Sequence, residues 1–231
     1  MNTSLKGKWI LITGASAGFG AEGARHFARE GAHLVLGARR ADRLESVAAE
    51  CEQAGAASAH VHELDVACTE SVNAFVDWLK PLTPKLDVLV NNAGGAHGMD
   101  TVADGKDADW EAMVQSNFLG LMRVTRACLP LMVENPGSTI INIGSIAGRV
   151  AYEYGSVYCG VKAAEKSITQ TLRLELNGTG VRVGTLDPGL ALTEFSIVRF
   201  KGNEALADKP YVGLDPLVAE DIAEAMVWMA T

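Results

Sequence analysis

Short apolar runs of strand length alternate along this chain with longer segments in which apolar residues recur at helical spacing. Each run is separated from the next by enough residues to form a helix. The expected strands are Trp9–Thr13, His33–Ala38, Ala59–Leu64, Val88–Asn91, Thr139–Ile143 and Arg182–Leu186. Alternation of this kind predicts βαβ units, and therefore a parallel sheet.

The intervening segments have the apolar spacing of amphipathic helices. The segment from residue 69 to 82, for example, carries Val72, Phe75, Val76 and Leu79 on one stripe. We expect polar residues such as Thr69 and Asp107 to cap helix starts, where acidic groups favour the positive end of the helix dipole. The expected helices are Gly20–Glu30, Asp42–Ala54, Thr69–Leu82, Asp107–Leu131, Ser156–Leu176 and Ala219–Met229.

The expected strands are apolar on both faces, as in Ile140–Ile143. Strands of this kind suit a sheet that helices cover on both sides. The 231 residues show no linker or change of composition, so we predict an α/β protein in which residues 1–231 form a single domain around a doubly wound parallel sheet. The stretch from 190 to 211 interrupts the alternation and is expected to be a mobile lid with a short helix around Thr193–Phe200.

Charge narrows the classes of partner. The net charge of −8 and the pI near 5.1 argue against a nucleic-acid surface or an anionic membrane surface. The tight basic cluster of Arg39, Arg40 and Arg43 is large enough for one phosphate. The polar start at Met1–Lys8 and the absence of a long uncharged apolar segment predict a soluble protein with neither an export signal nor a membrane span.

The cysteines and histidines give no metal-binding pattern. Cys51, Cys68, Cys128 and Cys159 lack metal-ligand spacing, so we expect free thiols in a reducing compartment, and therefore a cytoplasmic protein. His60 and His62 would share one face of a strand and could hold a metal, but no third ligand is near, and the preferred interpretation is a solvated strand edge. We therefore predict no metal site.

Three glycines, Gly14, Gly18 and Gly20, directly follow the first expected strand and open the first helix. In this context the backbone must turn tightly, and its free N–H groups can approach the pyrophosphate of a dinucleotide. An ordinary tight turn is the alternative.

The end of the second strand indicates which dinucleotide is bound. A free ribose 2′-hydroxyl usually meets a carboxylate at this place, but this chain has Arg39 and Arg40. A guanidinium suits a 2′-phosphate, so the sequence favours NADP over NAD. The alternative is that both arginines are merely solvated.

Candidate proton-transfer residues follow the fifth strand. Tyr158 and Lys162 are four residues apart and share one face of the expected helix. An ammonium group near a phenol favours the phenolate, so Tyr158 could exchange a proton with a substrate oxygen. Ser145, at the end of its strand, could hold that oxygen by a hydrogen bond.

Taken in order, these features resemble the short-chain dehydrogenases/reductases over nearly the whole chain. The motifs that carry the resemblance are Thr13-Gly14-x-x-x-Gly18-x-Gly20, Asn91-Asn92-Ala93-Gly94, Asn117, Ser145, Tyr158-x-x-x-Lys162 and Pro188-Gly189. The resemblance implies a Rossmann-type fold. It also implies that Ser145 orients the substrate and that Tyr158 is the catalytic acid/base. Lys162 would bind the nicotinamide ribose and lower the Tyr158 pKa, and Asn117 would complete a proton relay.

The family pattern also implies a set of cofactor contacts. Besides the three glycines, the two arginines, Tyr158 and Lys162, these are Ser16, Phe19, Asp65, Val66, Asn91, Gly94, Pro188, Gly189 and Thr193. Two of the assignments have structural alternatives. Asn117 could be an exposed residue on the outer face of its helix, and the side chain of Asn91 could tie neighbouring strands together.

A narrower resemblance, carried by Gly18-Phe19-Gly20 and by Thr193–Gly202, is to the NADP-dependent serine and 3-hydroxy acid dehydrogenases. It implies a small carboxylate substrate, with Arg199 or Arg149 as its partner, and a homotetramer or homodimer. The alternative for Arg199 is a lid arginine in water. Rival functions are reduction of another carbonyl, on a sugar, a steroid-like alcohol or a carrier-bound acyl chain, and NADP sensing without catalysis. Whether Arg199 faces the substrate space separates the enzymatic alternatives.

Overall fold

The computed structural model describes residues 4–231, so the first three residues of the polar start Met1–Lys8 lie outside the described residues. Six strands form one parallel sheet in the order β3-β2-β1-β4-β5-β6. Five strands have the predicted bounds, and the third both begins and ends one residue earlier than predicted. The strands are β1 (Trp9–Thr13), β2 (His33–Ala38), β3 (Ser58–Glu63), β4 (Val88–Asn91), β5 (Thr139–Ile143) and β6 (Arg182–Leu186).

The predicted helices are present, with ends that differ by up to three residues. They are α1 (Gly18–Arg29), α2 (Ala41–Ala54), α3 (Thr69–Leu79), α4 (Asp107–Met113), α5 (Gly120–Val133), α6 (Ser156–Glu175) and α9 (Ala219–Ala230). The predicted helix 107–131 contains a π-helical segment at Val114–Leu119 between α4 and α5. The expected capping by Thr69 and Asp107 is wrong, because both are already helical residues and neither helix has a side-chain cap.

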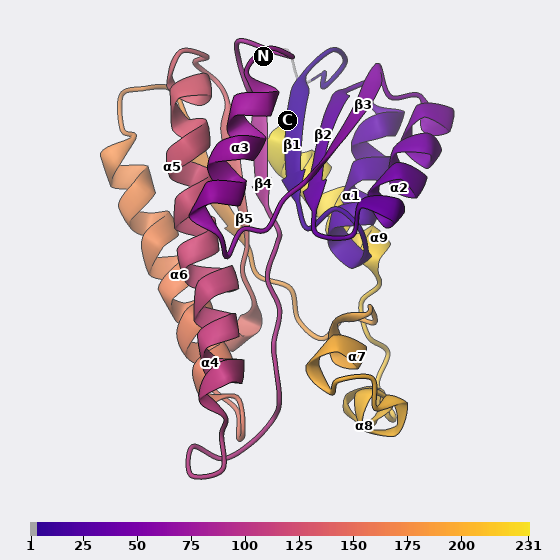
Figure 1. Cartoon of the computed structure of the whole chain (residues 1–231), viewed down its shortest axis with the longest axis vertical. Coiled ribbons are helices and arrows are strands. Elements are labelled where there is room, and N and C mark those ends of the chain that lie inside the picture. Colours follow the sequence, from indigo (N-terminus) through magenta and orange to yellow (C-terminus); the bar gives the residue numbers. More distant parts are fainter. Residues whose placement is uncertain (1–3) are drawn as a thin grey trace.

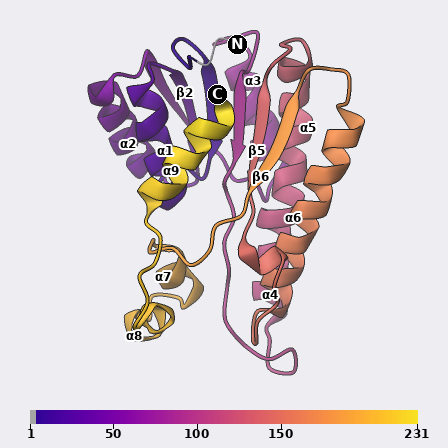
Figure 2. The same cartoon turned by 180° about the vertical axis from the view of Figure 1, so that it is seen from behind.

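Helices cover both faces of the sheet, which confirms the doubly wound α/β prediction. On β1, Ile10 and Ile12 belong to the apolar cluster beneath α1, α2 and α9, whereas Leu11 belongs to the cluster beneath α3, α5 and α6. Figures 1 and 2 show these two sets of helices on opposite sides of the strands. Alternate side chains of a buried strand point to opposite faces, so the continuous apolar runs fill both cores.

The strand order reverses between β1 and β4, and ligands of open α/β sheets bind beside such a reversal, at the carboxyl ends of the strands. The segment after β6 extends beyond this end of the sheet and carries α7 (Phe195–Arg199), α8 (Glu204–Asp208) and a 3₁₀ turn at Lys209–Tyr211. The predicted helix around Thr193–Phe200 is therefore present, and α8 was not predicted. Across residues 4–231, every helix is too short or too polar to cross a membrane.

Candidate active site

The glycine turn between β1 and α1 allows close backbone packing at the sheet reversal. Gly14 and Gly18 adopt φ of 67° and 52°, in the left-handed region that glycine tolerates best. A Cβ at Gly20 would lie 2.5 Å from the carbonyl oxygen of Gly14. The glycines predicted from the sequence are therefore required by the turn itself.

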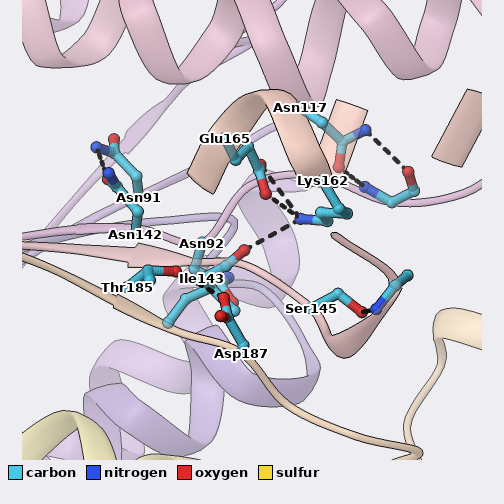
Figure 3. Close-up of polar contacts among 12 residues, drawn as sticks. Asn91, Asn92, Asn117, Asn142, Ile143, Ser145, Lys162, Glu165, Thr185 and Asp187 are labelled. Atoms are coloured by element: carbon cyan, nitrogen blue, oxygen red, sulfur yellow. Dashed lines mark hydrogen bonds and ion pairs between the residues drawn. The ribbon is translucent and has the colours of Figure 1, made fainter. Parts of the chain in front are cut away.

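Side chains from β1 and β4 hold the floor of this turn in place. The Thr13 hydroxyl accepts hydrogen bonds from the backbone N–H groups of Asn92 and Ala93, both at 3.0 Å. The Asn92 amide donates to the Thr13 carbonyl at 2.9 Å. The Asn91 amide, by contrast, donates to Thr125 and to Asn142 on β5, each at 2.9 Å. The Asn91 side chain thus makes the strand-tying contacts of the structural alternative, as Figure 3 shows for Asn142.

The basic residues after β2 lie at the edge of the glycine turn. Arg40 donates to the Ser16 hydroxyl at 3.2 Å, and both Arg40 and Arg43 pair with Glu194, at 3.0 and 2.6 Å. Arg39 is exposed. Glu194 comes from the segment that leads into α7, so this ion-pair cluster joins the lid region to the turn. Burial of Glu194 raises its pKa, but the two arginines outweigh that effect and the net shift is downward.

Asn117 lies in the π-helical segment and is fully buried, which excludes the exposed alternative. Its amide donates to the carbonyls of Gly95 and Met113 at 2.9 and 2.8 Å, and its Oδ1 accepts from the Gly95 N–H at 3.1 Å. A Cβ at Gly94 would lie 2.5 Å from Oδ1. Gly94 therefore lets the loop after β4 lie against Asn117.

Tyr158 and Lys162 are both buried and lie one turn apart on α6, as the sequence predicted. The Lys162 Nζ is 5.8 Å from the centre of the Tyr158 ring. Its hydrogen bonds go to the Ile143 carbonyl at 3.0 Å and to Glu165 Oε1 at 3.2 Å (Figure 3). The contact of Lys162 with Glu165 was not predicted from the sequence.

Ser145 directly follows β5 and Gly144, and its hydroxyl accepts from the backbone N–H of Ala147 at 3.1 Å. Arg149, four residues later, is exposed and pairs with the part-buried Asp187 at 2.6 Å. Asp187 also accepts from the Thr185 hydroxyl at 2.7 Å. In this structure, therefore, the guanidinium of Arg149 already has a carboxylate partner within the protein.

Arg199, in contrast, lines a pocket together with Tyr158, His97 and Trp110. The Arg199 side chain is 8% exposed, which excludes an arginine standing in water. It donates to the Gly98 carbonyl at 3.0 Å and to the Tyr152 hydroxyl at 2.9 Å. Its guanidinium carbon is 5.7 Å from the centre of the Tyr158 ring. The lid segment thus brings a cation to the candidate proton-transfer group.

The other predicted contacts lie around the same end of the sheet. A Cβ at Gly18 would lie 3.6 Å from the Thr193 side chain, so the start of the lid segment faces the glycine turn. The Pro188 carbonyl accepts from the Ile146 N–H at 3.0 Å, and Gly189 beside it is exposed. Asp65 accepts from the Ala67 N–H at 3.0 Å, Val66 is buried, and Phe19 packs on the core below α1.

Several polar residues of the site were not predicted. They are Glu165, Asp187, Glu194, Tyr152 and His97. Glu165 had a detectable signal, since it lies three residues after Lys162 and therefore on the same helix face. The other four reach the site from distant loops, and no local spacing marks them.

The cysteines and histidines behave as ordinary structural residues in the described chain. All four cysteines are free thiols, and residues 4–231 contain no cluster of three potential metal ligands. Cys159 is buried, as expected for a packed thiol. His60 stacks on Trp9, with ring centres 5.6 Å apart, and His62 packs on Trp78 at 4.8 Å. Both histidines lie on β3, an edge strand of the sheet as expected, but their rings are half-buried against aromatic neighbours, so they are less solvated than the sequence suggested.

Known proteins resemble this chain over almost its full length. Residues 8–203 match the family model for short chain dehydrogenase. An NADP-dependent 3-hydroxy acid dehydrogenase of Schizosaccharomyces pombe is 42% identical over 98% of this chain and 88% of that protein. Sulfoacetaldehyde reductase 2 of Chromohalobacter salexigens is 42% identical over 96% and 88%.

The fold comparison agrees with the sequence comparison. The structure of a closed form of serine dehydrogenase complexed with NADP+ superimposes with a TM-score of 0.91 at 40% identity, over 96% of this chain and 89% of that one. The glycine turn, the order of the strands and the Tyr158–Lys162 pair agree with this likeness. The chain therefore belongs to the short-chain dehydrogenase family.

Proposed function

We propose that this protein is an NADP-dependent dehydrogenase that interconverts a small 3-hydroxy acid, such as a serine-like or 3-hydroxypropionate-like compound, and its 3-oxo counterpart. The observation that carries the proposal is the pocket shared by Tyr158 and Arg199, which brings a proton-transfer group and a cation together. The names of relatives at about 40% identity support the same substrate class.

The chain's own residues fit NADP. The backbone N–H groups of the turn at Gly14, Gly18 and Gly20 would receive the pyrophosphate, and Arg39 with Arg40 would meet the 2′-phosphate. Neither arginine is buried, and Arg40 pairs with the part-exposed carboxylate of Glu194. A phosphate could take the place of that carboxylate as the partner of Arg40. The nicotinamide, when bound, supplies or accepts the hydride. The remaining predicted contacts, from Asp65 and Val66 to Pro188, Gly189 and Thr193, surround the same end of the sheet.

The proton is handled by the residues of α6 and β5. Tyr158 would donate a proton to the carbonyl oxygen in reduction and take it back in oxidation. Lys162 would stabilise the negative charge that forms on the phenol, and Ser145 would hold the substrate oxygen. Asn117, whose amide groups already bind Gly95 and Met113, would fix the helix backbone beside the proton path.

Arg199 would bind the acid group of the substrate. Its Nε and one terminal nitrogen have protein partners, which leaves the other terminal nitrogen without a partner among the described residues. Because a sulfonate offers the same charge as a carboxylate, the sulfoacetaldehyde reductases among the relatives give a second candidate substrate. In a sugar, a steroid-like alcohol or a carrier-bound acyl chain, no carboxylate or sulfonate lies beside the reacting carbonyl to pair with the buried Arg199.

The test is a steady-state assay of NADPH oxidation with 3-oxo acids, sulfoacetaldehyde and uncharged aldehydes. Tyr158→Phe should bind NADPH as tightly as the wild type and lose about 10²- to 10⁴-fold in kcat. A Tyr158→Phe enzyme that keeps its rate would refute the proton-transfer role. A wild-type protein that binds NADPH but reduces no compound of the panel would favour the non-catalytic NADP sensor.

We also propose a cytoplasmic homo-oligomer, a dimer or tetramer, with residues about 190–211 acting as a substrate lid on a single domain. The free thiols support the compartment. The contacts of the lid with the body through Arg199, Glu194 and Lys201 support closure over the pocket. Light scattering of the purified protein tests the assembly.

A further inference from the structure

A buried acidic residue that the proposed chemistry does not use lies against Lys162. The Glu165 side chain is 3% exposed, and both of its oxygens face the lysine, Oε2 at 2.9 Å and Oε1 at 3.2 Å from Nζ. Within the described residues, Oε2 has no hydrogen bond beyond this ion contact. The charge of Glu165 therefore depends on Lys162 for its compensation.

The same contact limits what the ammonium group can do. An ammonium has three N–H donors. One is directed to the Ile143 carbonyl at 3.0 Å and one to the Glu165 carboxylate, as Figure 3 shows. One donor is left for the Tyr158 side of the site. Nζ is therefore held between two partners, the Ile143 carbonyl at the end of β5 and the Glu165 carboxylate on the next turn of α6.

We propose that Glu165 is a positioning residue that keeps Lys162 protonated and holds its Nζ in place beside Tyr158. The proposal rests on the proposed function only in giving Lys162 its role toward Tyr158. The contact itself is between two buried side chains and exists without any substrate or cofactor.

Burial and charge act on the two groups in opposite directions. Burial is the largest influence on Lys162 and lowers its pKa, but the charge and hydrogen bond of Glu165, together with Tyr158 and Asp187, outweigh it, so that the net pKa is raised. Burial likewise raises the pKa of Glu165, and Lys162 opposes that shift without cancelling it. Without the carboxylate, burial would lower the pKa of the amine.

Other charged and titratable groups face this pair. Tyr158 precedes Lys162 on α6, and Arg199 comes over the Tyr158 ring from α7. Asp187, after β6, favours the protonated amine, but it is paired with Arg149 and bonded to Thr185. Asp187 therefore replaces only part of the stabilisation that Glu165 provides.

The decisive variant is Glu165→Gln, which keeps the size and one acceptor oxygen and removes the charge. The control is Glu175→Gln, which removes an exposed carboxylate from the same helix. In cofactor-free protein, the ¹³Cε resonance of Lys162, identified by its loss in Lys162→Met, is followed against pH. We expect the acid dissociation constant of Lys162 to rise about tenfold or more in Glu165→Gln and to stay unchanged in Glu175→Gln.

A second readout is the pH profile of the oxidation rate, in which Glu165→Gln should lose activity on the alkaline side where the wild type keeps it. A Glu165→Gln protein that has lost stability but titrates Lys162 like the wild type would overturn the proposal. If Glu165→Gln does not fold, the proposal is tested on the wild-type protein instead. Its Glu165 ¹³Cδ resonance must report a carboxylate at the pH of activity, and a protonated acid there would overturn the proposal as well.

These outcomes are separate from those that test the function. The Lys162 titration needs no turnover, so it can support the Glu165 contact even if Tyr158→Phe turns out to be active. Conversely, an inactive Tyr158→Phe together with an unchanged Lys162 titration would keep the proposed function and remove the role of Glu165.

Discussion

Replacing Arg199 by Met tests whether the pocket selects acids. The guanidinium is buried, stands 5.7 Å from the centre of the Tyr158 ring, and makes two hydrogen bonds to protein, to Gly98 and Tyr152. Methionine has a similar length and packs in an apolar pocket, so the substitution removes the charge and the donors without leaving a large cavity.

The expected loss follows from these contacts. Truncating one partner of a buried, hydrogen-bonded charge pair costs about 2–4 kcal/mol, which is roughly a 30- to 700-fold drop in kcat/KM at about 1.4 kcal/mol per tenfold. That drop applies to a substrate that bears a carboxylate or a sulfonate. An uncharged aldehyde should lose less than about fivefold, because it pairs with no group that has been removed. The lost bonds to Gly98 and Tyr152 should lower the stability by about 2 kcal/mol.

The assay compares kcat/KM of the wild type, Arg199→Met and Arg199→Lys on one 3-oxo acid and one uncharged aldehyde of equal size. Arg199→Lys keeps the charge but not the planar fork, so its loss on the acid should be intermediate. If Arg199→Met lowers kcat/KM equally for the acid and the aldehyde, Arg199 only holds the lid segment to Gly98, and the reasoning about substrate charge is refuted.

Three further predictions concern cofactor choice, pH and thiols. Arg39→Asp should raise the Kd for NADPH at least tenfold and that for NADH by little, measured by fluorescence titration; an unchanged ratio would remove the 2′-phosphate argument. Burial raises the pKa of Asp87, but hydrogen bonds from the Trp9 N–H and two side chains outweigh it, and the net pKa is lowered. Stability from Asp87 is thus present above its unfolded pKa and lost as pH falls through the lowered one. Asp87→Asn should accordingly lose about 2 kcal/mol in urea unfolding at pH 7 and progressively less as the pH falls below the unfolded pKa of an aspartate, and a loss that does not change with pH would contradict the charge argument. In native protein, iodoacetamide should label Cys68 first, as followed by mass spectrometry. Burial raises the pKa of the Cys51 and Cys128 thiols to about 12, so faster labelling of either thiol would contradict this expectation.

The sequence was sufficient for the sheet and for the residues that one local pattern joins. The apolar runs on β1 to β6 are long, bounded by turns and filled on both faces, so strand positions followed from periodicity. Tyr158 and Lys162 were found together because four residues make one helical turn. The same rule applied to Lys162 and Glu165 would have found the buried pair.

The rest of the site depends on tertiary contacts that no spacing encodes. Arg149 and Arg199 look equivalent in the sequence, and only the fold shows that Asp187 takes the first while the second enters the pocket. Glu194 meets Arg40 across more than 150 residues of chain, with a separation of 154. The helix starts at Thr69 and Asp107 were predicted correctly, but the N-cap positions fall one residue earlier, at Cys68 and Lys106, because a polar residue marks a cap only to within a residue or two.

The π-helical segment around Asn117 predicts how the helix responds when a residue is removed from it. A π-helical turn holds one residue more than an α-helical turn, so a helix with such a segment carries a surplus residue relative to a regular helix. Deleting one residue between Val114 and Leu119 should therefore leave an unbroken α-helix rather than a broken one. The helix would survive, and the helical residues on either side would keep roughly their relative orientation, but the backbone position that the wide turn gives Asn117 would be lost. Asn117 would swing away from Gly95, and a shorter, more regular protein would have lost its fit to the loop after β4.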